Sequence, residues 1–261
     1  MRSAVRAQTI FITGAAAGIG SETARLFHAR GWQVGVYDVD AKGVRCLLAE
    51  LGPCASGGVL DVTDAEAFAQ TLHQFAGHHG RLDVLLNNAG IASVGDFESI
   101  DTGRHACIVD INLKGVINGC HAALPWLRQT PDSRVINLAS ASAIYGTPGY
   151  ASYSATKFAV RGLSEALNIE WQRYGIPVFD LLPVFVNTAM LTPMRGNAIV
   201  RRLGVRLQAS DVAATIWHVA NTRRRRRVHW YVGMQARLMA LANKYVPDFL
   251  NRAIMRAISG Y

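Results

Sequence analysis

The sequence predicts an α/β domain: a parallel sheet of about seven strands with helices on both faces. Strand-like and helix-like segments alternate along the 261 residues. The strand-like segments are continuous apolar runs, which are typical of strands covered on both faces. Half of the residues are apolar and 17% are charged, which indicates a globular chain with a large core. Repeated β-α-β order with buried strands indicates a doubly wound, open sheet.

The expected strands are residues 9–13, 32–38, 57–62, 82–90, 134–140, 176–183 and 228–233. The expected helices are residues 19–31, 41–52, 64–79, 99–128, 151–174 and 210–221, with a loop region at 183–208. Asp64 is a suitable N-cap for the third helix. No internal repeat or linker composition divides the chain, so residues 1–233 are expected to form a single domain. Residues 234–261 are expected to extend that domain as an amphipathic basic helical segment.

Composition excludes several classes of protein. The four cysteines show neither a CxxC pair nor metal-ligand spacing, so we expect buried thiols in a reducing compartment and no metal site. The N-terminus lacks the long apolar stretch of a secretory signal, and no uncharged apolar run approaches the length of a membrane span. A cytoplasmic location is therefore expected.

A glycine-rich turn follows the first expected strand. TGAAAGIG places Gly14, Gly18 and Gly20 between that strand and the first helix. Glycine allows a tight turn and close approach of a ligand, and a helix N-terminus offers free N–H groups that suit a pyrophosphate. The spacing differs from the standard G-x-G-x-x-G fingerprint, so the turn alone is also compatible with a purely structural role.

Asp38 ends the second expected strand and favours a dinucleotide over a simple turn. A carboxylate there can accept hydrogen bonds from ribose hydroxyls and would repel a 2′-phosphate. The turn itself is uncharged at 15–17. NAD is therefore predicted rather than NADP. The alternative, that Asp38 caps the next helix, fits Asp40 better.

Tyr153 and Lys157 are four residues apart in the sequence GYASYSATKFAV. Residues at this spacing share a helix face. A nearby ammonium favours the phenolate, so the pKa of Tyr153 is expected to fall from about 10 to about 7. Ser140, at the end of the fifth strand, could donate a hydrogen bond to a substrate oxygen. Isolated pairs of this kind are often mere surface packing, but the glycine turn and Asp38 favour a catalytic role.

Several motifs occur together in chain order: TGAAAGIG (13–20), Asp61 with Val62, NNAG (87–90), Asn112 in DINLKG, Ser140 in NLAS, and YSATK (153–157). With them the sequence resembles the classical short-chain dehydrogenases/reductases, a family with a Rossmann-type fold, up to about residue 233. One motif departs. Where the family usually has Pro-Gly after the sixth strand, this chain has PVFVNT, so Val184 replaces the flexible glycine.

The resemblance implies an NAD-dependent oxidoreductase in which Tyr153 is the general acid/base. Lys157 would lower the pKa of Tyr153 and hold the nicotinamide ribose, and Ser140 would polarise the substrate carbonyl. Asn112 would hold a water that links Lys157 to solvent. The dinucleotide site would consist of Gly14, Ala17, Gly18, Ile19, Gly20, Asp38, Asp61, Val62, Asn88, Ala89, Gly90, Tyr153, Lys157, Pro183, Val186 and Thr188.

A hydrophobic substrate pocket is also expected, although its apolar members could equally belong to the core. The candidate residues are Ser142, Ile144, Tyr145, Tyr150, Phe185, Met190, Leu191 and Met194. Such a pocket would suit a bulky lipophilic secondary alcohol or ketone. A different hypothesis is a non-catalytic NAD-binding module that docks on a membrane or partner through its C-terminus.

The C-terminal segment carries most of the net charge of +9. Arg223 to Arg227 form a basic loop before the last strand. A helix that Pro247 would open carries Arg252 and Arg256 opposite an apolar stripe of Phe249, Leu250, Ala253, Ile254, Ala257 and Ile258. This helix could pack on the body, act as a lid, or lie peripherally on an anionic membrane. Nucleic acid is a poor candidate, because no stacking platform accompanies the arginines. The family resemblance further suggests a homodimer or homotetramer paired through residues 99–128 and 151–174.

Overall fold

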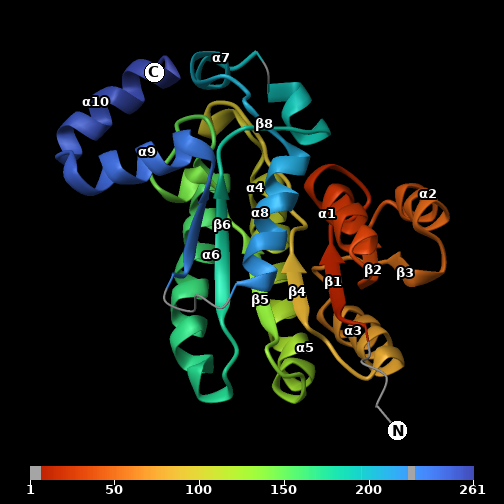
Figure 1. Cartoon of the computed structure of the whole chain (residues 1–261). Coiled ribbons are helices and arrows are strands. Elements are labelled where there is room, and N and C mark those ends of the chain that lie inside the picture. Colours follow the sequence, from red (N-terminus) through yellow and green to blue (C-terminus); the bar gives the residue numbers. More distant parts are fainter. Residues whose placement is uncertain (1–6, 195, 223–226) are drawn as a thin grey trace, which may run out of the picture.

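The computed structural model describes residues 7–194, 196–222 and 227–261. Its main sheet contains seven parallel strands in the order β3-β2-β1-β4-β5-β6-β9 (Figure 1). They are β1 (Thr9–Thr13), β2 (Gln33–Asp38), β3 (Ala55–Val59), β4 (Val84–Asn87), β5 (Arg134–Leu138), β6 (Val178–Pro183) and β9 (His229–Val232). A small second sheet pairs β7 (Val186–Asn187) with β8 (Leu207–Gln208). The predicted Rossmann-type fold is confirmed.

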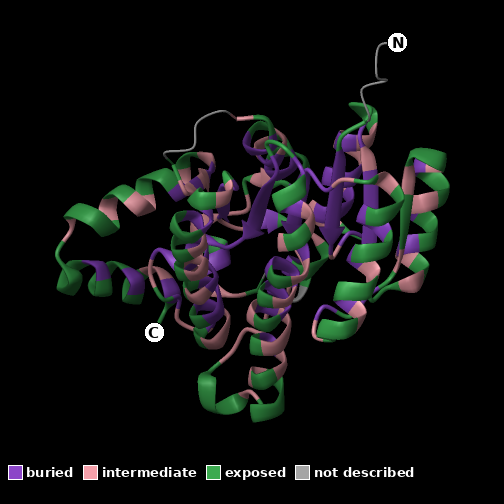
Figure 2. Cartoon of the chain, turned by 90° about the horizontal axis from the view of Figure 1, so that it is seen from below, coloured by how far each residue is buried: buried purple, intermediate pink, exposed green. Residues whose placement is uncertain are grey.

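Helices cover both faces of the main sheet. The helices in the described part of the chain are α1 (Gly18–Ala29), α2 (Ala41–Leu51), α3 (Ala65–His79), α4 (Thr102–Val109), α5 (Gly115–Gln129), α6 (Ala151–Glu170), α7 (Ala198–Leu203), α8 (Ala209–Asn221), α9 (Gly233–Tyr245) and α10 (Asp248–Ser259). Phe27 of α1, Leu47 of α2 and Ile216 of α8 belong to one buried cluster. Leu72 of α3 and Val160 of α6 belong to a second cluster on the opposite face. The central strands β1, β4, β5 and β6 lie buried between these two layers (Figure 2).

The order of the strands determines where a binding crevice can lie. The chain runs from β1 outward to β3 and then returns to the other side of β1 as β4. At such a reversal the loops after neighbouring strands diverge and leave a crevice beyond the carboxyl ends of the strands. The glycine turn follows β1, and NNAG begins at the end of β4, so both motifs lie at this crevice.

Three expected elements differ from the structure. The third strand lies at Ala55–Val59 rather than 57–62, because this edge strand is largely exposed and the apolar residues Leu60 and Val62 are buried beyond its end. The expected helix at 99–128 is divided into α4 and α5 by a π-helical turn at Asp110–Lys114. The expected loop at 183–208 contains β7, a 3₁₀ segment at Ala189–Met194, α7 and β8. Asp40 and Asp64 cap α2 and α3 as expected.

The C-terminal segment forms two helices rather than one. α9 follows β9 directly, and α10 begins just after Pro247. Both helices extend from the body at one end of the sheet (Figure 1). The expected basic loop lies outside the described residues except for Arg227. Within the described part of the chain, no helix combines the length and the hydropathy needed to cross a bilayer.

Candidate active site

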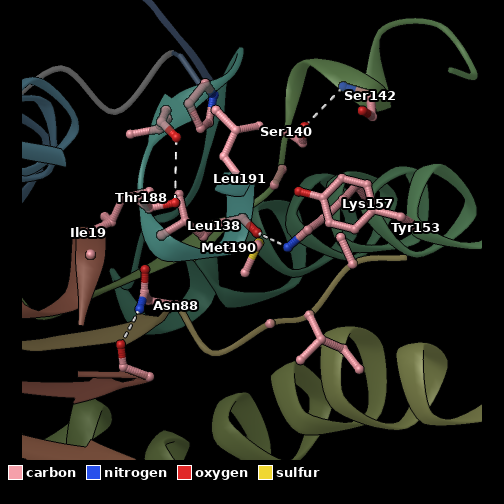
Figure 3. A pocket seen from close by; sticks show the side chains of 18 of the residues that line it. Ile19, Asn88, Leu138, Ser140, Ser142, Tyr153, Lys157, Thr188, Met190 and Leu191 are labelled. Atoms are coloured by element: carbon pink, nitrogen blue, oxygen red, sulfur yellow. Dashed lines mark hydrogen bonds between the residues drawn. The ribbon is translucent and has the colours of Figure 1, made fainter. Parts of the chain in front are cut away.

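A cavity of about 430 Å³ lies at the carboxyl ends of β1, β4, β5 and β6. Its lining extends from the glycine turn after β1 to the two C-terminal helices. Figure 3 shows Asn88 at one side and Ser140, Tyr153 and Lys157 at the other. The cavity therefore brings together segments that are distant in the sequence.

The glycine turn is packed so tightly that side chains are excluded. Gly14 has a φ of +64°, and a Cβ there would lie 2.7 Å from the Cα of Ala89. A Cβ on Gly20 would overlap the carbonyl oxygen of Gly14. The Asn88 amide fastens the turn by donating to the carbonyl oxygens of Thr13 at 3.0 Å and Gly14 at 2.8 Å. Ala17, the N-cap residue of α1, makes no side-chain cap, and the first residues of α1 line the cavity, so this helix N-terminus is suited to an anion.

Asp38 lies at the end of β2 beside this turn. One carboxylate oxygen accepts the backbone N–H of Ala16 at 3.0 Å, and the other accepts that of Asp40 at 3.0 Å. Each oxygen retains capacity for a second hydrogen bond. Asp38, Asp61 and Val62 line the same end of the cavity. A carboxylate fixed in this way fits ribose hydroxyls.

Asn112 lies within the π-helical turn and is fully buried. Its Oδ1 accepts the N–H of Ile91 at 2.8 Å, and its Nδ2 donates to the carbonyl oxygen of Ile91 at 2.9 Å and to the hydroxyl of Thr156 at 3.3 Å. Asn112 does not itself line the cavity, whereas Ile91 does. π-turns recur at functional sites, and this one turns an amide toward the loop after β4.

Ser140, Tyr153 and Lys157 line the opposite end of the cavity. Lys157 is only 5% exposed, and its Nζ donates to the carbonyl oxygen of Leu138 at 2.7 Å (Figure 3). The same Nζ lies 5.5 Å from the centroid of the Tyr153 ring. Ser140 follows β5, and its hydroxyl accepts the N–H of Ser142 at 3.1 Å.

Burial dominates the ionisation of both groups. It lowers the pKa of Lys157 from 10.5 to about 8. It also raises the pKa of Tyr153 above 10, while the hydrogen bond with Ser140 opposes this rise. The expected lowering of the Tyr153 pKa is therefore wrong for the protein groups acting alone. The reason is that desolvation of the buried phenol outweighs the hydrogen bond with Ser140.

The chain is similar to proteins of known family. Residues 8–198 match the family model described as short chain dehydrogenase. The oxidoreductase UcpA of Escherichia coli (strain K12) is 31% identical over 227 residues, which cover 79% of this chain and 86% of UcpA. The chain belongs to the short-chain dehydrogenase family.

Solved structures of similar proteins contain nicotinamide dinucleotides. The 3-ketoacyl-(acyl-carrier-protein) reductase from Brucella melitensis, complexed with NADH, has a TM-score of 0.79 and 25% identity, covering 88% of this chain and 98% of that chain. ElxO with NADP bound has the same TM-score and identity, covering 87% of this chain and 97% of that chain. This short-chain dehydrogenase is therefore an oxidoreductase that acts on CH–OH or carbonyl groups with a nicotinamide cofactor.

Most of the residues predicted for the site of this short-chain dehydrogenase meet at the cavity. All predicted dinucleotide residues line it except Gly20, which supports the turn from behind. Of the predicted substrate residues, Ile144 and Tyr145 do not line it. Ile144 is buried in the core cluster beneath α6, and Tyr145 packs beside Tyr150 in a third cluster.

Sequence reasoning missed several cavity residues. They include Ile91, Ala92, Thr147, Ile199, Leu203, Met239 and Met255. Thr147 lies between Ser140 and Tyr153, so its position along the chain was a usable signal. Met239 and Met255 belong to α9 and α10, and no local pattern indicates that these helices return to the site.

Proposed function

We propose that this oxidoreductase interconverts a lipophilic secondary alcohol and its ketone with NAD(H). The observation that carries the proposal is that one cavity combines a polar end with apolar walls. Ser140, Tyr153 and Lys157 supply polar groups at one end. The adjoining walls are apolar and come from Leu191, Met194, Ile199, Leu203, Met239 and Met255. Such a cavity orients a carbonyl at its polar end and surrounds the rest of the molecule with hydrocarbon.

The residues at the polar end have complementary tasks. The Ser140 hydroxyl donates to the substrate oxygen and holds it beside Tyr153. The Tyr153 phenol gives its proton to that oxygen during reduction and takes it back during oxidation. A nicotinamide held beside Tyr153 and Lys157 would supply the hydride for reduction and accept it in oxidation. Because burial keeps Tyr153 protonated at neutral pH, we expect ketone reduction to be favoured there and alcohol oxidation to accelerate as the pH rises.

Tyr153→Phe tests the acid/base role. Loss of the hydroxyl is expected to lower kcat by about 10²- to 10⁴-fold, the range for a lost general acid. The measurement is NADH absorbance with a panel of lipophilic ketones. Tyr145→Phe is the matched control, because that tyrosine lies close by without lining the cavity. Equal rates for wild type and Tyr153→Phe would refute the assignment.

The preference for NAD over NADP is supported by Asp38. Its carboxylate lies at the cavity and would repel a 2′-phosphate, and the turn at 15–17 carries no cation to offset that repulsion. Asp38→Ser is expected to lower the ratio of kcat/KM for NAD to that for NADP by at least about tenfold, equivalent to 1.4 kcal/mol. Asp40→Ala is the control, because Asp40 only caps α2. A wild-type enzyme that prefers NADP would overturn this preference and leave the chemistry at Tyr153 intact.

A further inference from the structure

The helices α9 and α10, here called the C-terminal hairpin, carry large apolar side chains on their outer surface. On α9 these are Met234, Leu238, Leu241 and Tyr245, each more than half exposed. Their spacing of four, three and four residues places them on one face of the helix. On α10, Phe249 is 74% exposed, and Leu250 and Ile254 are also exposed. Ala236 of α9 and Met255 of α10 are buried instead, so each helix turns a different face toward the body.

Cations border these apolar stripes. Arg237 and Lys244 adjoin the stripe of α9, and Arg252 and Arg256 adjoin that of α10. Asp248 is the sole acid between Arg227 and Tyr261. An apolar stripe edged by lysine and arginine matches an anionic lipid surface, where the stripe enters the acyl boundary and the cations meet phosphates.

We propose that the C-terminal hairpin docks on an anionic lipid surface. A second copy of the chain is a poorer occupant, because a two-fold interface would set the same cationic patch against itself. An apolar protein interface would likewise provide no negative charges to pair with the four cations. The pattern of charges therefore favours an anionic lipid surface as the partner.

The hairpin also connects this surface to the cavity. Met239 of α9 and Met255 of α10 line the cavity from the faces opposite the exposed stripes. Docking would consequently place one wall of the cavity directly above the lipid. The docking proposal stands on the exposed stripes and the cations, and it does not depend on the reaction proposed at Tyr153.

The experiment is co-sedimentation of the full chain with vesicles. One set contains phosphatidylglycerol in phosphatidylcholine, and the other contains phosphatidylcholine alone. The double variant Leu238→Ser/Leu241→Ser is expected to weaken partitioning into the anionic vesicles by at least tenfold, roughly the loss from removing one buried leucine. Ile169→Ser is the matched control, because Ile169 is 69% exposed on α6 and lies about four turns along that helix from Tyr153. It should bind like the wild type.

A second arm tests the charges. Arg237→Gln/Arg252→Gln should weaken binding to anionic vesicles several-fold, and high salt should do the same to the wild type. Wild-type protein that fails to sediment with anionic vesicles would overturn the proposal. The proposal would also fail if a hairpin variant changed the oligomeric mass, measured by size-exclusion chromatography with light scattering, while neither it nor the wild type bound vesicles. Turnover of a water-soluble ketone without vesicles should be retained by these variants, so failure of docking and failure of the proposed reaction are distinguishable.

Discussion

At the level of a single residue, Lys157 shows that the site contains a charge whose burial is unfavourable. Its ammonium is almost completely buried and donates a hydrogen bond to the carbonyl oxygen of Leu138. Burial of a charge is unfavourable, and the lowered pKa of about 8 records this. The folded protein therefore binds fewer protons at this group than the unfolded chain does between pH 8 and 10.5. Stability should rise with pH across that window, and the penalty should be complete below it.

Lys157→Met removes this penalty. The stability of the wild type relative to the variant is expected to increase by roughly 3 kcal/mol between pH 8 and 10.5, from the shift of the Lys157 pKa. Below pH 8 the variant should be at least as stable as the wild type after allowance for about 1–3 kcal/mol from the unpaired Leu138 oxygen. The measurement is urea unfolding of both proteins across this range. Parallel stability curves would contradict the prediction.

The residues that carry the chemistry could be predicted because their relation is local. Tyr153 and Lys157 share a helix face through spacing alone, and Gly14 follows a strand directly. Ionisation could not be predicted in the same way. The acceptor of Lys157 comes from β5, and the burial of Tyr153 depends on elements from the whole chain.

At the level of elements, the π-helical turn determines how the loop after β4 is held. The side-chain amide of Asn112 forms hydrogen bonds with both the backbone N–H and the backbone carbonyl oxygen of Ile91. A Cβ on the neighbouring Gly90 would lie 3.2 Å from Asn112 Oδ1 and 3.7 Å from Lys157 Nζ. The turn, the loop and the buried lysine thus form one packed unit.

Asn112→Ala should disturb this unit. Two backbone groups of Ile91 lose their partners, so we expect a destabilisation of about 1–3 kcal/mol. Activity should fall as well, because Ile91 lines the cavity. Denaturant unfolding and steady-state kinetics provide the measurements. Asn221→Ala is the control, since that exposed amide bonds to Trp217 within its own helix. A comparable loss in both variants would argue against a special role for the turn.

Most elements could be predicted from the sequence because strands buried on both faces appear as uninterrupted apolar runs. β3 departs from this rule because it lies at the edge of the sheet. The π-turn could not be predicted, since one extra residue per turn leaves no periodicity signal. The helical character of residues 234–261 was expected, but their division into α9 and α10 was not.

At the scale of the whole molecule, we propose that copies of the chain pair through α4, α5 and α6. Val109, Ile117 and Phe158 present exposed apolar side chains on these three helices. Light scattering should give a mass at least about twice the chain mass of 28.3 kDa. Phe158→Glu should lower that mass, and Val59→Glu, at an exposed position on the edge strand β3, should not. A monomeric wild type would refute this assembly.

The walls of the cavity come from both ends of the sequence, and this has a consequence for biosynthesis. Gly14, Asp38 and Asn88 leave the ribosome long before Met239 and Met255. A chain that terminates prematurely, or is clipped between α8 and α10, would keep the turn that grips a dinucleotide. Its reaction chamber, however, would stand open to water on the missing side. Such a fragment would keep the residues that line the dinucleotide end of the cavity and lack the methionines that close its apolar end.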